Sequence, residues 1–62
     1  MKRLTVHYNN KSRLFIIETD NDGTKSLTAA PRWVNNENTV RTWLNDRMND
    51  KTFPRDAEIF FQ

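Results

Sequence analysis

Apolar and polar residues alternate near the start of the chain. Leu4, Val6 and Tyr8 are separated by polar side chains, and this period of two is typical of a strand with one buried face. Residues 9–12 follow with two asparagines and a serine, which favour a tight turn because Asn tolerates left-handed backbone angles. We therefore expect a first strand that reverses direction near residue 10.

The next segment, residues 13–19, is rich in residues that favour strands. Its apolar side chains fall on both faces, with Leu14 and Ile16 on one and Phe15 and Ile17 on the other. A strand that is apolar on both sides is typical of the middle of a sheet. We assign Leu14 and Ile16 to the core face, which leaves Phe15 and Ile17 on a face that a single helix cannot cover.

Residues 20–23 carry the strongest hairpin signal in the sequence. Asp22 precedes Gly23, and glycine readily takes the positive φ that two-residue hairpin turns require. A third strand is expected over residues 24–28. Ala30 stands before Pro31 and is disfavoured in a helix, so residues 29–33 are interpreted as a connector or an edge, anchored by Trp33 and Val34.

One helix is predicted after this connector. Asn35 or Asn36 is suited to cap it, and Glu37 lies four residues before Arg41, a favourable spacing for a helical ion pair. The apolar residues that follow have helical spacing and predict a stripe that lies on the sheet: Val40, Trp43, Leu44 and Met48.

Pro54 ends any continuation of the helix, and residues 57–61 predict a final strand. The order is thus β-β-β-α-β, an α+β fold in which a small antiparallel sheet has one helix packed on one face. Residues 1–62 are expected to form a single domain. The side chains predicted to pack together are Leu14, Ile16, Val40, Trp43, Leu44 and Ile59.

The residues that usually carry catalysis or bind metals are scarce. Cysteine is absent, which excludes thiolate ligands and thiol nucleophiles. His7 is the only histidine, and alternation puts it on the face opposite Leu4. The acids of residues 18–22 resemble the start of a calcium loop, but Ala29 stands where a bidentate carboxylate is needed. We therefore expect no enzyme, no metal and no cofactor.

Charge and hydropathy limit the binding partners and the cellular location that we expect. The net charge is +2, with ten basic residues scattered along the chain, whereas dedicated nucleic-acid binders usually concentrate charge on one face. The alternating first residues lack the apolar run of a signal peptide, and no segment is apolar enough to span a membrane. A cytoplasmic protein without membrane contact is expected.

Two segments have partial resemblances to phage DNA-binding families. The layout of residues 4–48 is similar to that of the arm-type DNA-binding domain of phage tyrosine recombinases, which implies a sheet that reads DNA, although the last strand is an addition. Residues 38–44 with Phe53 and Pro54 resemble the recognition helix and the start of the wing of phage excisionases, but the wing glycine is missing. Neither resemblance assigns the chain to a family.

Two binding functions remain. A tiny domain presents a surface more readily than it encloses a pocket, and eight asparagines in 62 residues are typical of small phage or mobile-element reading frames. The first expectation is a regulator or inhibitor that binds a larger host protein, with contact candidates Trp33, Phe53, Arg55, Phe15, Ile17 and Phe60. The alternative is a DNA- or RNA-binding accessory protein with a basic sheet face, whose candidates are Arg3, His7, Lys11, Arg13 and Arg32. Apolar side chains on both sheet faces further predict a homodimer.

Overall fold

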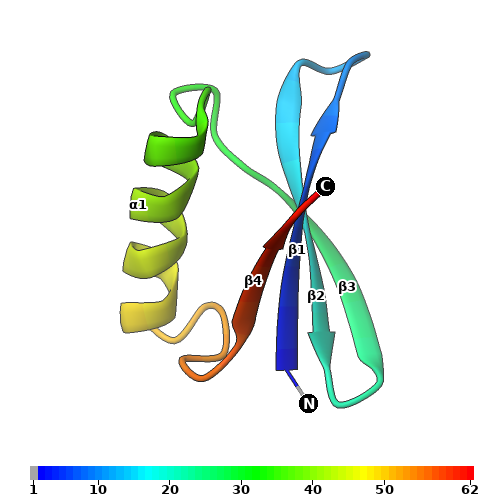
Figure 1. The fold of residues 1–62 in the computed structure, drawn as a ribbon, viewed down its shortest axis with the longest axis vertical. Helices are drawn as coiled ribbons and strands as arrows, with labels where there is room; N and C mark the ends of the chain where they lie inside the picture. The colour runs from blue at the N-terminus through cyan, green and yellow to red at the C-terminus, as the bar shows by residue number, and fades with distance from the viewer. Residues whose placement is uncertain (1) are drawn as a thin grey trace.

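Four strands and one helix make up residues 2–62, the part of the chain that the computed structural model describes (Figure 1). The elements are, in chain order, β1 (Lys2–Asn9), β2 (Leu14–Asn21), β3 (Thr24–Ala29), α1 (Glu37–Asn49) and β4 (Glu58–Phe61). The predicted β-β-β-α-β order and the single covering helix are confirmed.

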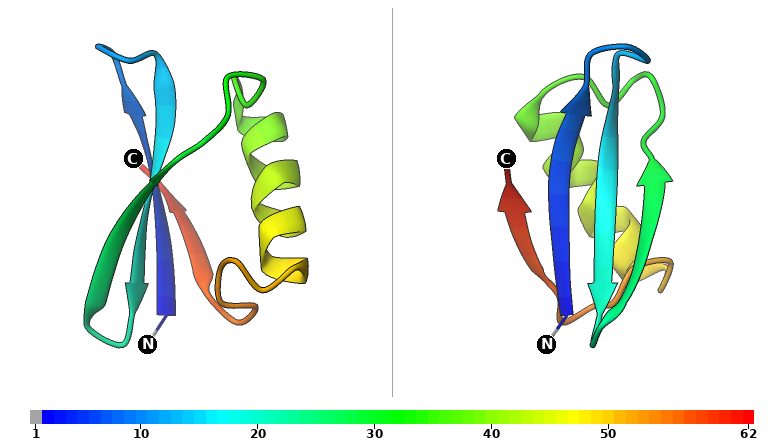
Figure 2. Two further views of the ribbon diagram at one scale, coloured as in Figure 1. Left: turned by 180° about the vertical axis from the view of Figure 1, so that it is seen from behind. Right: turned by 90° about the vertical axis from the view of Figure 1, so that its right-hand side faces the viewer.

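The sheet has the strand order β3-β2-β1-β4. β1, β2 and β3 form an antiparallel meander, but β4 pairs with β1 in parallel, with Leu4 opposite Ile59. The expected all-antiparallel sheet is therefore mixed. The reason is the long connection through α1, which carries the chain from one edge of the sheet to the other and lets β4 run in the same direction as β1 (Figure 2).

Both hairpin turns use residues with positive φ. Asp22 (φ 55°) and Gly23 (φ 99°) form the two-residue turn between β2 and β3, as in a type I′ hairpin. The first turn is longer: Asn9 Oδ1 accepts the N–H groups of Lys11 and Ser12 at 2.9 and 3.2 Å. Arg13 (φ 59°) then returns the chain to β2.

The helix begins and ends at well-defined caps. Asn36 Oδ1 accepts the N–H of Thr39 at 3.0 Å, and Thr39 Oγ1 accepts the N–H of Asn36 at 3.1 Å, which is a reciprocal capping box. At the other end Lys51 has φ 69°, and the N–H of Thr52 donates to the carbonyl of Arg47 at 2.9 Å, the pattern of a Schellman motif. The capping role expected of the asparagines belongs to Asn36.

The core lies between α1 and one face of the sheet, which we call the covered face (Figure 1). Val40, Trp43 and Leu44 of α1 are buried there, as predicted from the helical stripe. The other buried apolar residues come from the strands and the two loops around the helix: Leu4, Val6, Ile17, Ala30, Val34 and Phe53.

The face assignment of β2 was wrong. Val6 is paired with Ile17, and cross-strand neighbours share a face, so Ile17 is fully buried under the helix with Phe15 packed beside it. Leu14 and Ile16 therefore lie on the opposite side and are not part of the core. A shift of one residue moves every side chain of a strand to the other face, and the run of four apolar residues left that choice undetermined.

Two positions in the loops decide between earlier expectations. Trp33 and Val34 were both expected to anchor the connector, but only Val34 is buried, and Trp33 is 54% exposed, which its other role as a contact candidate requires. Phe53, expected to be an exposed contact residue, is buried and packs edge-to-face on Trp43 with ring centroids 5.7 Å apart. Phe53 closes the core below the helix and is not available to a partner in the folded chain.

Candidate binding surface

The sheet face that α1 does not cover, which we call the open face, is the main candidate surface (Figure 2). Alternation places on it the strand residues whose neighbours are buried in the core. In register they form rows across the strands: Glu58, Arg3, Asp20 and Lys25 make one, Phe60, Thr5, Glu18 and Leu27 the next, and His7, Ile16 and Ala29 the third.

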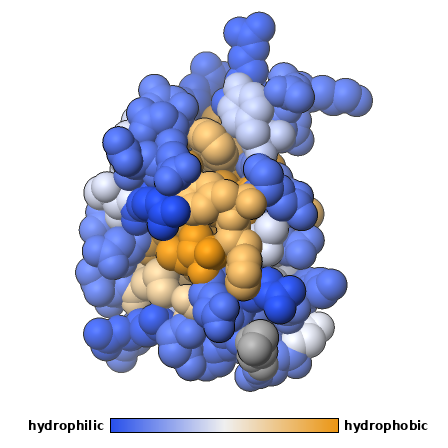
Figure 3. Space-filling view, viewed as in Figure 1, coloured by the Kyte–Doolittle hydropathy of each residue, from blue (hydrophilic) through white to orange (hydrophobic). Residues whose placement is uncertain are grey.

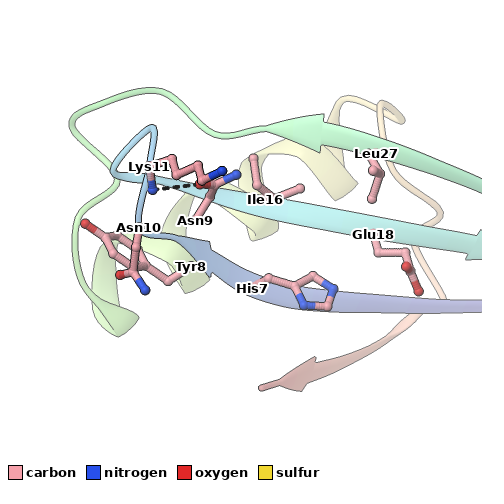
Figure 4. A pocket seen from close by; sticks show the side chains of 8 residues that line it. All are labelled: His7, Tyr8, Asn9, Asn10, Lys11, Ile16, Glu18 and Leu27. Carbon is pink, nitrogen blue, oxygen red and sulfur yellow. Dashed lines mark hydrogen bonds between the residues drawn. The ribbon is translucent and has the colours of Figure 1, made fainter.

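A hollow of about 590 Å³ opens over β1, β2 and β3 and extends to the first turn (Figure 4). Its apolar lining comes from Ile16 and Leu27, and Leu27 is 70% exposed. His7, Tyr8, Glu18 and the turn residues 9–11 provide the polar part. Exposed leucine beside half-buried isoleucine is a surface on which an apolar group of a partner gains contact area.

Glu18 is the acidic group of this hollow. Its Cα partners are Thr5 and Leu27, and its side chain is half-buried. Within residues 2–62 it forms no hydrogen bond and no ion pair. A carboxylate without a cation beside the apolar side chain of Leu27 favours a basic side chain from outside the chain, because opposite charges across an interface attract.

Charges on the open face alternate in sign. Arg3 lies opposite Glu58 on one side and Asp20 on the other, and Lys25 faces Asp20 from β3. The antiparallel pairing of β1 with β2 thus brings Arg3 beside the acidic end of β2. Opposite charges in register stabilise the sheet and leave no uniform basic face.

The candidates for nucleic-acid contact do not gather in one place. Arg3 and the turn residues Lys11 and Arg13 are at opposite ends of β1, about 20 Å apart at the rise of a strand. The guanidinium of Arg3 lies over the ring of Phe60, 5.1 Å from its centroid. Arg32 is exposed in the connector before the helix, and His7 is half-buried on the open face.

The candidates for protein contact divide into three groups. Ile17 and Phe53 are buried in the core, and Phe15 is half-buried against it. Trp33 and Arg55 are exposed in the two loops that flank the helix. Phe60 is the only one of the six on the open face, and it is 42% exposed.

Three residues of the hollow were missed by sequence reasoning. Ile16 was placed in the core, and Leu27 and Glu18 were not considered as contact residues. The signal that identifies them is the pairing of β2 with β1: once Val6 and Ile17 share the buried face, Ile16 and Glu18 must point away from it, and Leu27 follows from its register with Glu18.

The described residues contain no cluster of three side chains suited to a metal ion, and no helix among them is long and apolar enough to cross a membrane. Comparison with known proteins found no matching family model, no similar curated protein and no similar solved structure.

Proposed function

We propose that this chain is a non-enzymatic binding domain that regulates or inhibits a larger protein through the open face of its sheet. The observation that carries the proposal is the hollow at Ile16 and Leu27 with the unpaired carboxylate of Glu18 beside it. The partner segment is one that presents a lysine or arginine, whose aliphatic stem lies on Leu27 while its charged end reaches Glu18.

The rigid scaffold supports this use of the surface. β2 is central, with β1 and β3 on either side, so Ile16, Glu18 and Leu27 stand on hydrogen-bonded strands rather than on loops. A surface held in place before binding loses little conformational freedom when a partner docks. The charged rows around the hollow supply a polar rim of both signs, which suits a protein partner better than a polyanion.

The test compares two matched glutamates. Affinity capture from nuclease-treated lysate, followed by calorimetry with the captured protein, is carried out with the wild type and with Glu18→Gln and Glu37→Gln. Glu37 is an exposed helix residue already paired with Arg41 at 3.2 Å. Glu18→Gln is expected to weaken binding about tenfold or more, and Glu37→Gln to leave it unchanged.

Leu27→Lys provides the second readout, because it places a cation in the apolar part of the hollow. It is expected to abolish capture while the domain remains folded, since Leu27 makes no contribution to the core. Binding that survives both Glu18→Gln and Leu27→Lys contradicts the proposed surface, and capture that disappears with nuclease favours the nucleic-acid alternative.

A further inference from the structure

β4 is an edge strand whose side chains are apolar on both faces. Ile59 and Phe61 share the covered face with Leu4 and Val6, and Phe60 lies on the open face. Phe60 is 42% and Phe61 37% exposed. The view onto this edge shows an apolar patch surrounded by hydrophilic residues (Figure 3), so β4 leaves aromatic surface in water.

The outer side of β4 also carries unpaired backbone groups. The N–H of Gln62 donates to the carbonyl of Val6 at 3.0 Å. Because consecutive residues of a strand point their backbone groups to alternate sides, Phe60 faces β1 in the same way. The N–H and C=O groups of Ile59 and Phe61 therefore point outward, where another strand is able to pair with them.

We propose that this edge binds a second copy of the chain, with two β4 strands pairing antiparallel about a two-fold axis at Phe60. In that register Phe60 stands opposite its own counterpart, and Ile59 stands opposite Phe61 of the second copy. The outward backbone groups of Ile59 and Phe61 meet each other, which is the geometry of a hydrogen-bonded antiparallel pair. A surface that matches itself under a two-fold axis forms a closed dimer.

Side-chain chemistry agrees with this register on both faces. On the covered face the apolar row of Leu4 and Ile59 continues into Phe61 and Val6 of the second copy. On the open face Glu58 lies opposite Gln62 of the second copy, so a carboxylate meets an amide donor and like charges are not brought together. Arg3 and Arg41 lie over Phe60 and Phe61, 5.1 and 4.6 Å from the ring centroids, which leaves ring edges for the other copy.

The opposite edge of the sheet is less suited to pairing. The N–H of Ala30 donates to the carbonyl of Phe15 at 2.8 Å, so by alternation Lys25 and Leu27 direct their backbone groups outward from β3. Lysine on an edge strand discourages pairing with a second strand, and the neighbouring residues of β3 are small and polar. β4 has no lysine or proline between Glu58 and Phe61.

The dimer is expected to be weak, because four residues per copy bury less area than the standard interface. Sedimentation velocity from about 5 to 500 µM should show a monomer that converts to a dimer with a dissociation constant on the order of 100 µM. Over the same range amide exchange at Ile59 and Phe61 should slow about tenfold or more. Exchange at Lys25 and Leu27 on the other edge should not change.

Two substitutions locate the interface. Phe60→Lys places two lysines opposite each other at the two-fold axis and should weaken association about tenfold or more. Leu27→Lys makes the same change on β3 and should not affect the dimer, although it is expected to abolish the binding of the larger protein. The two proposals therefore fail independently of each other.

Phe60→Thr is the milder variant if Phe60→Lys fails to fold, since threonine is compatible with a strand, and it too should weaken the dimer about tenfold. A strict monomer at the highest concentration overturns the proposal and leaves the β4 edge to a strand of another protein. So does a dimer that Leu27→Lys disrupts and Phe60→Lys does not.

Discussion

At the scale of single residues, the two tryptophans have opposite environments. Trp43 is 5% exposed and contacts Phe53, while Trp33 stands in solvent. The helical spacing of Trp43 was sufficient to place it in the core, because a stripe of four apolar residues on a helix has a single direction. Trp33 lies in a connector without periodicity, so nothing in the sequence indicated which of Trp33 and Val34 turns inward.

Trp43→Ala is expected to reduce the free energy of unfolding by about 3–5 kcal/mol, through lost burial and the cavity that remains. Trp33→Ala is the matched control and should change it by about 0.5 kcal/mol or less. Urea denaturation followed by circular dichroism measures both. A Trp43→Ala variant that unfolds cooperatively at nearly the wild-type midpoint contradicts the packing described above.

The loop after α1 lowers the pKa of the Asp50 side chain. The hydroxyl and the N–H of Thr52 donate to Asp50 Oδ1 at 2.6 and 2.9 Å. Together with the nearby guanidinium of Arg47, they lower the pKa of Asp50 from its usual 3.8. A lowered pKa in the folded state means that this carboxylate stabilises the fold above pH 3.8, and that the contribution disappears as the pH falls through the lower value.

Thr52→Val removes the hydroxyl donor and should raise the pKa of Asp50 toward 3.8. Carbon-detected NMR of the side-chain carboxyl during an acid titration measures the shift. Thr42→Val is the control, because the hydroxyl of Thr42 donates to the carbonyl of Asn38 and does not contact Asp50. An Asp50 titration that is the same in all three proteins rules out the Thr52 hydroxyl as the cause.

At the scale of elements, the sequence predicted turns and helix caps correctly, but it did not predict how the strands and the helix are placed relative to one another. The Asp22–Gly23 turn and the Asn36 cap depend on a few adjacent residues, so the sequence predicted both hairpins and the helix within a residue or two. The covered face of β2 and the direction of β4 depend on which strands pair and where the helix crosses. These are decided by distant residues, and the hollow at Ile16, Glu18 and Leu27 was missed for the same reason.

The corrected face of β2 is tested by adjacent isoleucines. Ile17→Ala should lower the free energy of unfolding by about 2–5 kcal/mol, because Ile17 is fully buried beneath the helix. Ile16→Ala, on the open face, should cost about 1 kcal/mol or less, the scale of strand preference. Thermal unfolding of the two variants in parallel distinguishes the faces. If Ile16→Ala is the less stable variant, Ile16 and not Ile17 faces the core, as the sequence analysis expected.

The end of the helix offers a stabilising substitution. Lys51 adopts φ 69°, and a left-handed conformation costs a residue with a side chain about 1–2 kcal/mol. Lys51→Gly removes this strain and adds some flexibility to the unfolded chain. The net gain should raise the melting temperature by about 4 °C or more. Lys11→Gly, at a turn position without positive φ, should not raise it in the same calorimetric scan.

At the scale of the whole molecule, the sheet has one covered face and one open face with charges of both signs. The net charge is only +2, and Arg3 is flanked by Asp20 and Glu58, so we expect the molecule to attract polyanions weakly. Contacts spread over both ends of β1 neutralise few phosphates at once, and affinity for nucleic acid depends on how many are neutralised together.

Fluorescence anisotropy with labelled duplex and single-stranded DNA at low salt measures this directly. The wild type is expected to show no saturable binding at micromolar concentration, and the Arg3→Ala/Arg13→Ala double variant should behave in the same way. Micromolar binding by the wild type that the double variant loses contradicts the protein-binding proposal and establishes the basic residues as the contact.

The parallel pairing of β4 with β1 predicts an order of folding events. Arg3 and Glu58 meet across more than fifty intervening residues, whereas β1, β2 and β3 pair through short turns. Closing a long loop is slow compared with forming a hairpin, so the three-stranded meander should acquire protection first and the docking of α1 and β4 should limit the rate. During synthesis on the ribosome, the backbone groups on one side of β1 would therefore stay unpaired until residues 58–61 leave the exit tunnel.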